Sequence, residues 1–153
     1  MVFVLIMLLI FACDLAVKYR ITNGWKGERK LLKEKLLLRK MENPGLAMGR
    51  MQRHPKLILL VTGSLLMGVT AFFLKTLRRT GNIPEKLGLS LMLGGGWNNW
   101  YDRLIKGSVT DYVSINCRWQ RIRNIVFNIS DAAIFLGAIL AGIGGIIGSF
   151  NKR

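Results

Sequence analysis

The stretch GGGWNNWYDRLIKGSVTDY, residues 94–112, decides how this chain is interpreted. It continues an apolar run that begins at Leu87, and it adds two asparagines, an arginine and two aspartates. Ionised side chains of this kind cost about 2.5–3.5 kcal/mol each to place in a membrane on insertion scales. Such a set at the end of an apolar run is therefore a hypothesis for a functional site.

The composition points to a membrane protein. The chain has 153 residues, of which 51% are hydrophobic, yet its formal net charge is +15, which suits neither a disordered tail nor an ordinary soluble domain. The apolar residues form blocks that approach the roughly 20 residues a helix needs to cross a bilayer. We expect an all-α membrane protein, a single domain over residues 1–153, with four transmembrane helices at about 2–17, 57–74, 85–101 and 131–150.

The first block is also the size of the apolar region of a secretory signal peptide, but it lacks the basic residues that precede such a region. The few thiol and imidazole side chains, Cys13, Cys117 and His54, are scattered and form no metal-ligand pattern. We therefore expect no metal site, no disulfide and no cofactor.

The segment between the first two blocks is strongly basic, because residues 18–56 hold twelve of the 23 Lys and Arg residues. Its leucines follow neither a helical period nor a full strand alternation, so helix and strand both stay open for residues 20–40. Asn23-Gly24 and Asn43-Pro44-Gly45 predict turns. We expect a small elaboration between spans one and two, with strands as one option, that faces lipid headgroups. The aromatic platforms of a nucleic-acid surface are missing from this segment.

A chain with four spans crosses the membrane in alternating directions. One side of the membrane therefore holds the end of span one, the start of span two, the end of span three and the start of span four. The unusual polar residues fall at these places: Asp14, Lys18, Asn43, Asn99, Asp102, Arg103, Asp111, Asn128 and Asp131. The turn KTLRRTGNIPEK, residues 75–86, holds ordinary surface charges on the other side. Convergence on one face predicts one site.

Each of these residues also has an ordinary structural explanation. The explanations are an i,i+4 pair for Asp14 and Lys18, a helix cap for Ser130 or Asp131, an interfacial ion pair for Asp102 and Arg103, and an aromatic belt for Trp97, Trp100, Tyr101 and Trp119. Taken singly, these explanations are the simpler ones. They weaken when all of them must hold at once on one face.

Residues 94–112, followed by FNISDAAI at 127–134, resemble the signature of the lipoprotein signal peptidase (signal peptidase II) family, bacterial inner-membrane aspartic proteases. That signature has a Gly-Gly pair, an Asn, Asp-Arg, Gly-x-Val-x-Asp and later Asn-x-Ala-Asp. Upstream, DLAVK at 14–18 and NPGLAMG at 43–49 resemble two further family motifs. All four blocks occur in the expected order. Two departures are Ser130, where alanine is usual, and Met48 in place of a common aromatic.

The resemblance implies that Asp111 and Asp131 form a catalytic dyad that cleaves prolipoproteins just before their diacylglyceryl-modified cysteine. It also implies roles for further residues: Asn43, Asn99, Arg103 and Asn128 would bind substrate, while Asp14, Lys18 and Asp102 would give structural support. Two neighbouring carboxylates suit hydrolysis, because like charges cannot both ionise readily and the pair holds one proton near working pH. Such a site needs no metal and no cofactor.

Family membership implies a site at the extracytoplasmic face of the bacterial inner membrane, with a lipidated prolipoprotein as substrate. Charge counting disagrees, because the loops on that side hold 17 Lys and Arg residues and the other side holds six. We side with the motif and expect the basic loop to contact anionic lipid headgroups. Two alternatives are a catalytically silent relative that binds lipidated peptides, and a small basic holin or channel protein with polar residues along a pore.

Overall fold

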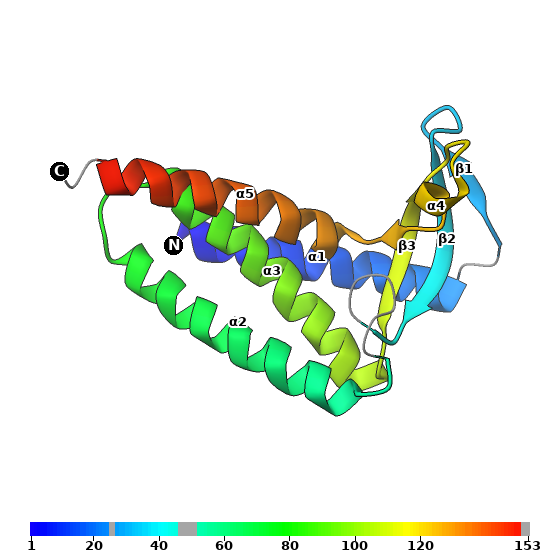
Figure 1. Ribbon diagram of the computed structural model, residues 1–153, viewed down its shortest axis with the longest axis horizontal. Helices are drawn as coiled ribbons and strands as arrows, with labels where there is room; N and C mark the ends of the chain where they lie inside the picture. Colours follow the sequence, from blue (N-terminus) through cyan, green and yellow to red (C-terminus); the bar gives the residue numbers. More distant parts are fainter. Residues whose placement is uncertain (25–26, 46–51, 151–153) are drawn as a thin grey trace.

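The computed structural model describes residues 1–24, 27–45 and 52–150. Four long helices form a bundle, and a small sheet stands across one end of it (Figure 1). The long helices are α1 (Val2–Gly24), α2 (Pro55–Leu77), α3 (Ile83–Lys106) and α5 (Ile129–Phe150), and α4 (Gln120–Arg123) is a short helix beside the sheet. The α2–α3 turn, the start of α1 and the end of α5 lie at the end of the bundle opposite the sheet.

The helix α3 is the centre of the bundle, because it packs against α1, α2 and α5. Close approach depends on small residues: a Cβ added at Gly95 would lie 2.4 Å from the backbone oxygen of Ser130 on α5. The indole Nε1 of Trp100 donates to the backbone oxygen of Leu59 at 3.0 Å. This tryptophan, predicted to belong to an interfacial belt, thus joins α3 to α2.

The sheet is antiparallel throughout, with the order β1 (Arg29–Leu31), β2 (Leu36–Asn43), β3 (Val109–Ile115) and β4 (Val126–Phe127). The β option for the segment after the first span is therefore confirmed. The sheet is larger than expected, because β3 and β4 come from the chain between α3 and α5. A hairpin alone is marginal in water, and pairing β2 with β3 completes a stable sheet and sets Met41 opposite Asp111.

The helices are longer than the predicted spans. The helix α1 continues through Asn23 and Gly24, where a turn was predicted. Lys18 and Arg20, which follow the predicted span, lie on the last turns of this helix. The helix α3 continues past residue 101 and ends at Gly107, whose φ of 76° suits the left-handed cap that terminates a helix. The polar residues Asn98, Asn99, Asp102 and Arg103 therefore lie on α3, since polar side chains alone do not end a helix whose partners satisfy them.

Within the described residues, three helices are long and apolar enough to cross a membrane: α1, α2 and α5. The helix α3 has a similar length, but its buried residues include Asn98, Asn99 and Asp102. A helix at the centre of a bundle tolerates such residues because its neighbours cover them.

Candidate active site

The elements that carry the predicted polar residues meet at the sheet end of the bundle (Figure 1), which agrees with the parity of the spans. Asp111 lies on β3, and Asp131 lies in the first turn of α5. Asn99 comes from the last two turns of α3, and Asn43 ends β2. Four elements that are distant in the sequence thus contribute to one cluster of side chains.

Neutral amides hold both carboxylates. Asn128 Nδ2 donates to Asp111 Oδ1 at 2.7 Å and to Asn99 Oδ1 at 3.2 Å. Asn99 Nδ2 in turn donates to Asp131 Oδ1 at 2.8 Å, and Asn43 Nδ2 donates to Asp111 Oδ2 at 3.2 Å. Amides orient a carboxylate without supplying a cation that would fix it permanently in the ionised form. The geometry therefore leaves both aspartates able to change protonation state.

The start of α5 shows which residue caps that helix. Asn128 Oδ1 accepts a hydrogen bond from the backbone N–H of Asp131 at 2.8 Å. Asp131 Oδ2 accepts one from the backbone N–H of Asn128 at 3.2 Å. This reciprocal pair resembles a capping box, in which the first residue is the cap and the residue three positions later bonds back to it. Asn128 is therefore the cap, and Asp131 keeps its other oxygen for Asn99.

Asp111 titrates in an unusual range. Burial, with the side chain only 3% exposed, and then the neighbouring charge of Asp131 raise the pKa of Asp111 to about 7. Hydrogen bonds from Asn43 and Asn128 and the charge of Lys18 act in the opposite direction. The Asp111 carboxyl therefore exchanges its proton near neutral pH, which is the range in which a catalytic acid or base works best.

Arg103 stands beside the pair. One guanidinium nitrogen donates to the backbone oxygen of Gly45 at 2.9 Å, and another donates to that of Asn99 at 3.3 Å. Its charge interacts with Asp131, Asp111 and Asp102. The guanidinium thus supplies positive charge next to both carboxylates without a direct ion pair to either of them.

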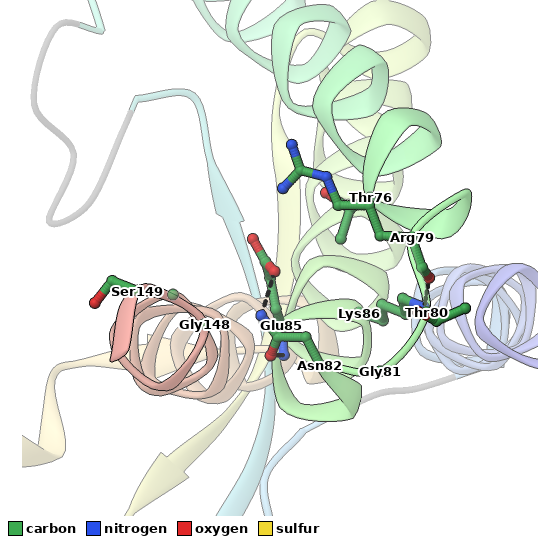
Figure 2. A pocket seen from close by; sticks show the side chains of 10 residues that line it. Thr76, Arg79, Thr80, Gly81, Asn82, Glu85, Lys86, Gly148 and Ser149 are labelled. Carbon is green, nitrogen blue, oxygen red and sulfur yellow. Dashed lines mark hydrogen bonds between the residues drawn. The ribbon is translucent and has the colours of Figure 1, made fainter. Parts of the chain in front are cut away.

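A cavity of about 390 Å³ lies between α2, α3 and α5 and reaches this cluster. Its walls are mostly apolar, and its polar lining comes from Thr62, Asn99, Arg103 and Asp131. A larger cavity, of about 510 Å³, lies at the opposite end of the bundle, around the α2–α3 turn and the end of α5 (Figure 2). Its lining includes Arg79 and Lys86 but neither Asp111 nor Asp131. We assign the site to the smaller cavity, because Asp131 lines it and the amides of Asn99 and Asn128 connect Asp131 to Asp111.

Behind the two aspartates lies a buried ion cluster centred on Lys18, whose side chain is 0% exposed. Its Nζ lies 3.1 Å from an oxygen of Asp14 and 3.1 Å from one of Asp102. It also donates to Asn98 Oδ1 at 2.6 Å and to Asn99 Oδ1 at 2.8 Å. The Asp14–Lys18 contact is therefore part of a connection between α1 and α3 and more than a local helix pair.

The ion pair considered between Asp102 and Arg103 is not the one that forms. Asp102 pairs with Lys18 and, at 2.9 Å, with Lys106. Adjacent residues on a helix point about 100° apart, so Asp102 turns into the bundle while Arg103 turns toward the cavity. The structure thus separates the two neighbours into the ion cluster and the cavity lining.

Sequence reasoning missed two residues of this region, Asn98 and Tyr112. Asn98 accepts from Lys18 and donates to the backbone oxygen of Phe11 at 2.7 Å. The Tyr112 hydroxyl donates to Asp14 Oδ1 at 2.6 Å. Each directly neighbours a motif residue, and that adjacency was the only signal in the sequence. Met48, the second departure from the family motif, lies outside the described residues.

The bundle of apolar helices and the small sheet at its end carry two carboxylates that are linked by amides. This arrangement is typical of a membrane hydrolase of the aspartic type. The family model described as Signal peptidase (SPase) II matches residues 6–147. The chain therefore belongs to the signal peptidase II family and is an aspartic endopeptidase of that family.

Relatives carry a consistent name. The lipoprotein signal peptidase of Chlorobium luteolum is 33% identical over 106 residues, which are 65% of this chain and 62% of the relative, so this match spans less than two thirds of that protein. The lipoprotein signal peptidase of Wigglesworthia glossinidia brevipalpis is 29% identical, over 89% of this chain and 88% of the relative. That of Shouchella clausii is 28% identical, over 97% of this chain and 95% of the relative.

Two solved structures, each described as a bacterial membrane enzyme, share the fold. One, at 2.3 Å resolution, has a TM-score of 0.84 and 24% sequence identity, and the match covers 99% of this chain and 92% of the other. The second, at 1.9 Å, has a TM-score of 0.79 and the same identity, with 93% and 90% of the two chains covered. The bundle with its sheet is thus the fold of known membrane enzymes.

Proposed function

We propose that Asp111 and Asp131 are the catalytic carboxylates of this peptidase. The observation that carries the proposal is the bridge of amides between them, in which Asn128 contacts Asp111 and Asn99 contacts Asp131. Asn43 holds the other oxygen of Asp111. If these motif residues were separate helix caps and surface charges, they would have no common role. A catalytic site gives all of them one role.

In the proposed mechanism, the pair holds one proton near neutral pH, and this proton belongs to the pair rather than to either residue. The ionised carboxylate takes a proton from water as the water oxygen bonds to the peptide carbonyl carbon. The protonated carboxyl gives its proton to the carbonyl oxygen, so the tetrahedral intermediate is neutral. The C–N bond then breaks as the carboxyl proton passes to the leaving amine, and a hydroxyl of the intermediate gives its proton to the other carboxylate as the product carboxyl group forms, so the pair again holds a single proton.

The proposed substrate is a diacylglyceryl-modified prolipoprotein, cleaved just before its lipidated cysteine. The apolar walls of the 390 Å³ cavity suit an apolar chain. Asp131 lines the same cavity and would place its carboxyl next to that chain. Asn43, Asn99 and Asn128 would hold the peptide backbone, and Arg103 would donate to carbonyl oxygens of the peptide or the lipid. The family and its consistently named relatives support this choice of substrate.

We further propose that α3 crosses the membrane together with α1, α2 and α5, since it lies within the same bundle and has a similar length. The sheet end would face the extracytoplasmic side of the bacterial inner membrane. The basic residues of β1 and β2 would then meet anionic headgroups, at about 1 kcal/mol for each well-placed charge. The polar residues gather at the sheet end, which disfavours the channel alternative, because a channel predicts them along a pore.

The orientation is tested with single cysteines in a background that lacks Cys13 and Cys117. A membrane-impermeant maleimide added outside intact cells should label Lys35→Cys, in the hairpin of the sheet, and should leave Thr80→Cys unlabelled until the membrane is opened. Both positions are exposed, so access alone separates them. Labelling of Thr80→Cys but not of Lys35→Cys in intact cells would invert the proposed orientation.

The activity is tested directly. The purified full chain in detergent micelles is incubated with a synthetic diacylglyceryl prolipopeptide, and the product is identified by mass. We expect one cut, directly before the lipidated cysteine, and none in the same peptide without lipid. Binding of the lipidated peptide without any cleavage would favour the silent relative over the peptidase.

A further inference from the structure

One buried carboxylate outside the proposed dyad receives an unusual number of hydrogen bonds. Asp14, on α1, is 0% exposed. Its Oδ1 accepts from the Tyr112 hydroxyl at 2.6 Å, and its Oδ2 accepts from the backbone N–H of Ser130 at 3.3 Å and from the Ser130 hydroxyl in a very short contact. Lys18 completes the set at 3.1 Å. The carboxylate is therefore fully engaged by α1, β3 and α5.

The two hydroxyl donors sit next to the two proposed catalytic residues. Tyr112 directly follows Asp111 on β3, and Ser130 directly precedes Asp131 on α5. The Tyr112 hydroxyl also accepts a hydrogen bond from the backbone N–H of Ile129 at 3.2 Å. The strand that carries one aspartate and the helix that carries the other are thus attached to the same carboxylate.

We propose that Tyr112 and Ser130 are positioning residues that set the spacing of Asp111 and Asp131 by binding Asp14 from both sides. The proposal rests on the proposed function of the two aspartates. Neighbouring residues on a strand point to opposite faces, so Asp111 turns toward Asn43 and Asn128 while Tyr112 reaches back to Asp14 on α1. A shift of β3 or of the start of α5 then has to break a charge-assisted bond to Asp14, which is stronger than a neutral one.

This role gives a purpose to the departure at residue 130. Alanine, the residue expected there from the family signature, has no hydroxyl to donate, so the second attachment to Asp14 through a side chain is a property of this chain. The side chain of Ser130 is 0% exposed, and Tyr112 is 2% exposed. Both hydroxyls are therefore shielded from water. A hydrogen bond to an ionised group is electrostatically stronger in such a buried environment than in water.

The spacing between Asp111 and Asp131 affects the pH at which the pair loses its shared proton, which a purely structural role of Tyr112 and Ser130 would not change. Two like charges raise the pKa of the pair more strongly when they are closer. The charged groups that face the two aspartates are Arg103 and, through it, Asp102 from α3, with Asp14 and Lys18 from α1. Tyr112→Phe and Ser130→Ala leave all of these charges in place. A looser pair should therefore release its shared proton at lower pH.

The test measures kcat and KM for the diacylglyceryl prolipopeptide from pH 5 to pH 9, with the full chain in micelles. The variants are Tyr112→Phe, Ser130→Ala and the double variant. The matched control is Ser90→Ala, which removes a wholly buried hydroxyl that, in the described part of the chain, donates within α3 to the backbone oxygen of Lys86. Melting in the same micelles reports folding.

We expect each single variant to lose about tenfold in kcat with KM within about twofold, and the alkaline limb of the profile to move to lower pH. The double variant should be little worse than either single, because both hydroxyls hold the same spacing between Asp111 and Asp131. Ser90→Ala should keep the wild-type profile. If Ser130→Ala does not fold, Tyr112→Phe decides alone, since it removes one oxygen and no carbon.

Unchanged kcat and an unchanged profile in folded Tyr112→Phe and Ser130→Ala would overturn the proposal, provided that the wild type cleaves. Losses that multiply to about a hundredfold would also overturn it, because they would show two independent effects. Failure of the wild type itself to cleave would instead refute the proposed function. The two failures are thus distinguishable.

Discussion

Replacing Asp111 by asparagine separates catalysis from stability, because the structure predicts opposite effects on the two. A general acid or base contributes about 10²–10⁴ to a rate, and Asp111 would serve as both in turn. We expect Asp111→Asn, and likewise Asp131→Asn, to lower kcat by about 10³–10⁴-fold. The double variant should be little worse than either single variant, because residues that act as one unit are not additive.

The stability of Asp111→Asn should improve relative to wild type as the pH rises. The pKa of this carboxyl is 3.8 in the unfolded reference and about 7 in the fold. The folded protein thus keeps a proton that the unfolded chain gives up, so wild-type stability falls as pH rises through this window. At 1.36 kcal/mol per pKa unit, the variant gains about 3 kcal/mol relative to wild type between pH 5 and pH 8.

The assay pairs initial cleavage rates of the diacylglyceryl prolipopeptide with melting curves in micelles at pH 5 and pH 8. The control is Glu85→Gln at the opposite end of the bundle, whose activity should match wild type. If Asp131 served only the capping box with Asn128, its asparagine variant would be nearly silent, because the amide oxygen of Asn can still accept the hydrogen bond from the backbone N–H of Asn128. Cleavage within tenfold of wild type in either single Asn variant would refute the catalytic assignment.

Three further outcomes follow from the same geometry. Wild-type kcat/KM, measured from pH 5 to 9, should fall above about pH 7, where Asp111 loses its raised-pKa proton and the pair becomes doubly ionised; a profile that keeps rising to pH 9 would contradict this. Lys18→Met leaves the buried Asp14 without its cation and Asp102 with Lys106 alone, and it should destabilise the protein by about 3–5 kcal/mol in melting experiments. Lys30→Met, in an exposed pair, should cost at most about 1 kcal/mol. Gly95→Ala puts a methyl 2.4 Å from a backbone oxygen and should cost about 1–3 kcal/mol, while Gly142→Ala, with nothing within 4 Å, should be tolerated; equal melting temperatures would mean that the helices separate easily.

Much of the site was visible in the order of the residues. Apolar blocks long enough to approach a bilayer predicted the helical bundle, and the parity of four spans put Asp14, Asn43, Asn99, Asp111 and Asp131 at one end of it. That inference needs no tertiary information, because helices that traverse a bundle must alternate in direction. The strand pattern of residues 20–40 stayed ambiguous, because β2 takes its regular form only when β3, more than 60 residues later, pairs with it.

The sequence by itself indicated a membrane protein and the end of the bundle where its polar residues meet, since these depend on local composition and on the number of spans, and its motifs carried the resemblance to the peptidase family. Only the tertiary structure decided which partners each polar residue has. It assigned Asp102 to Lys18 rather than to Arg103, and it joined Tyr112 and Ser130 through Asp14. Side chains of one motif turn to different faces of their helix or strand, and a hydrogen bond depends on what the facing element presents at about 3 Å.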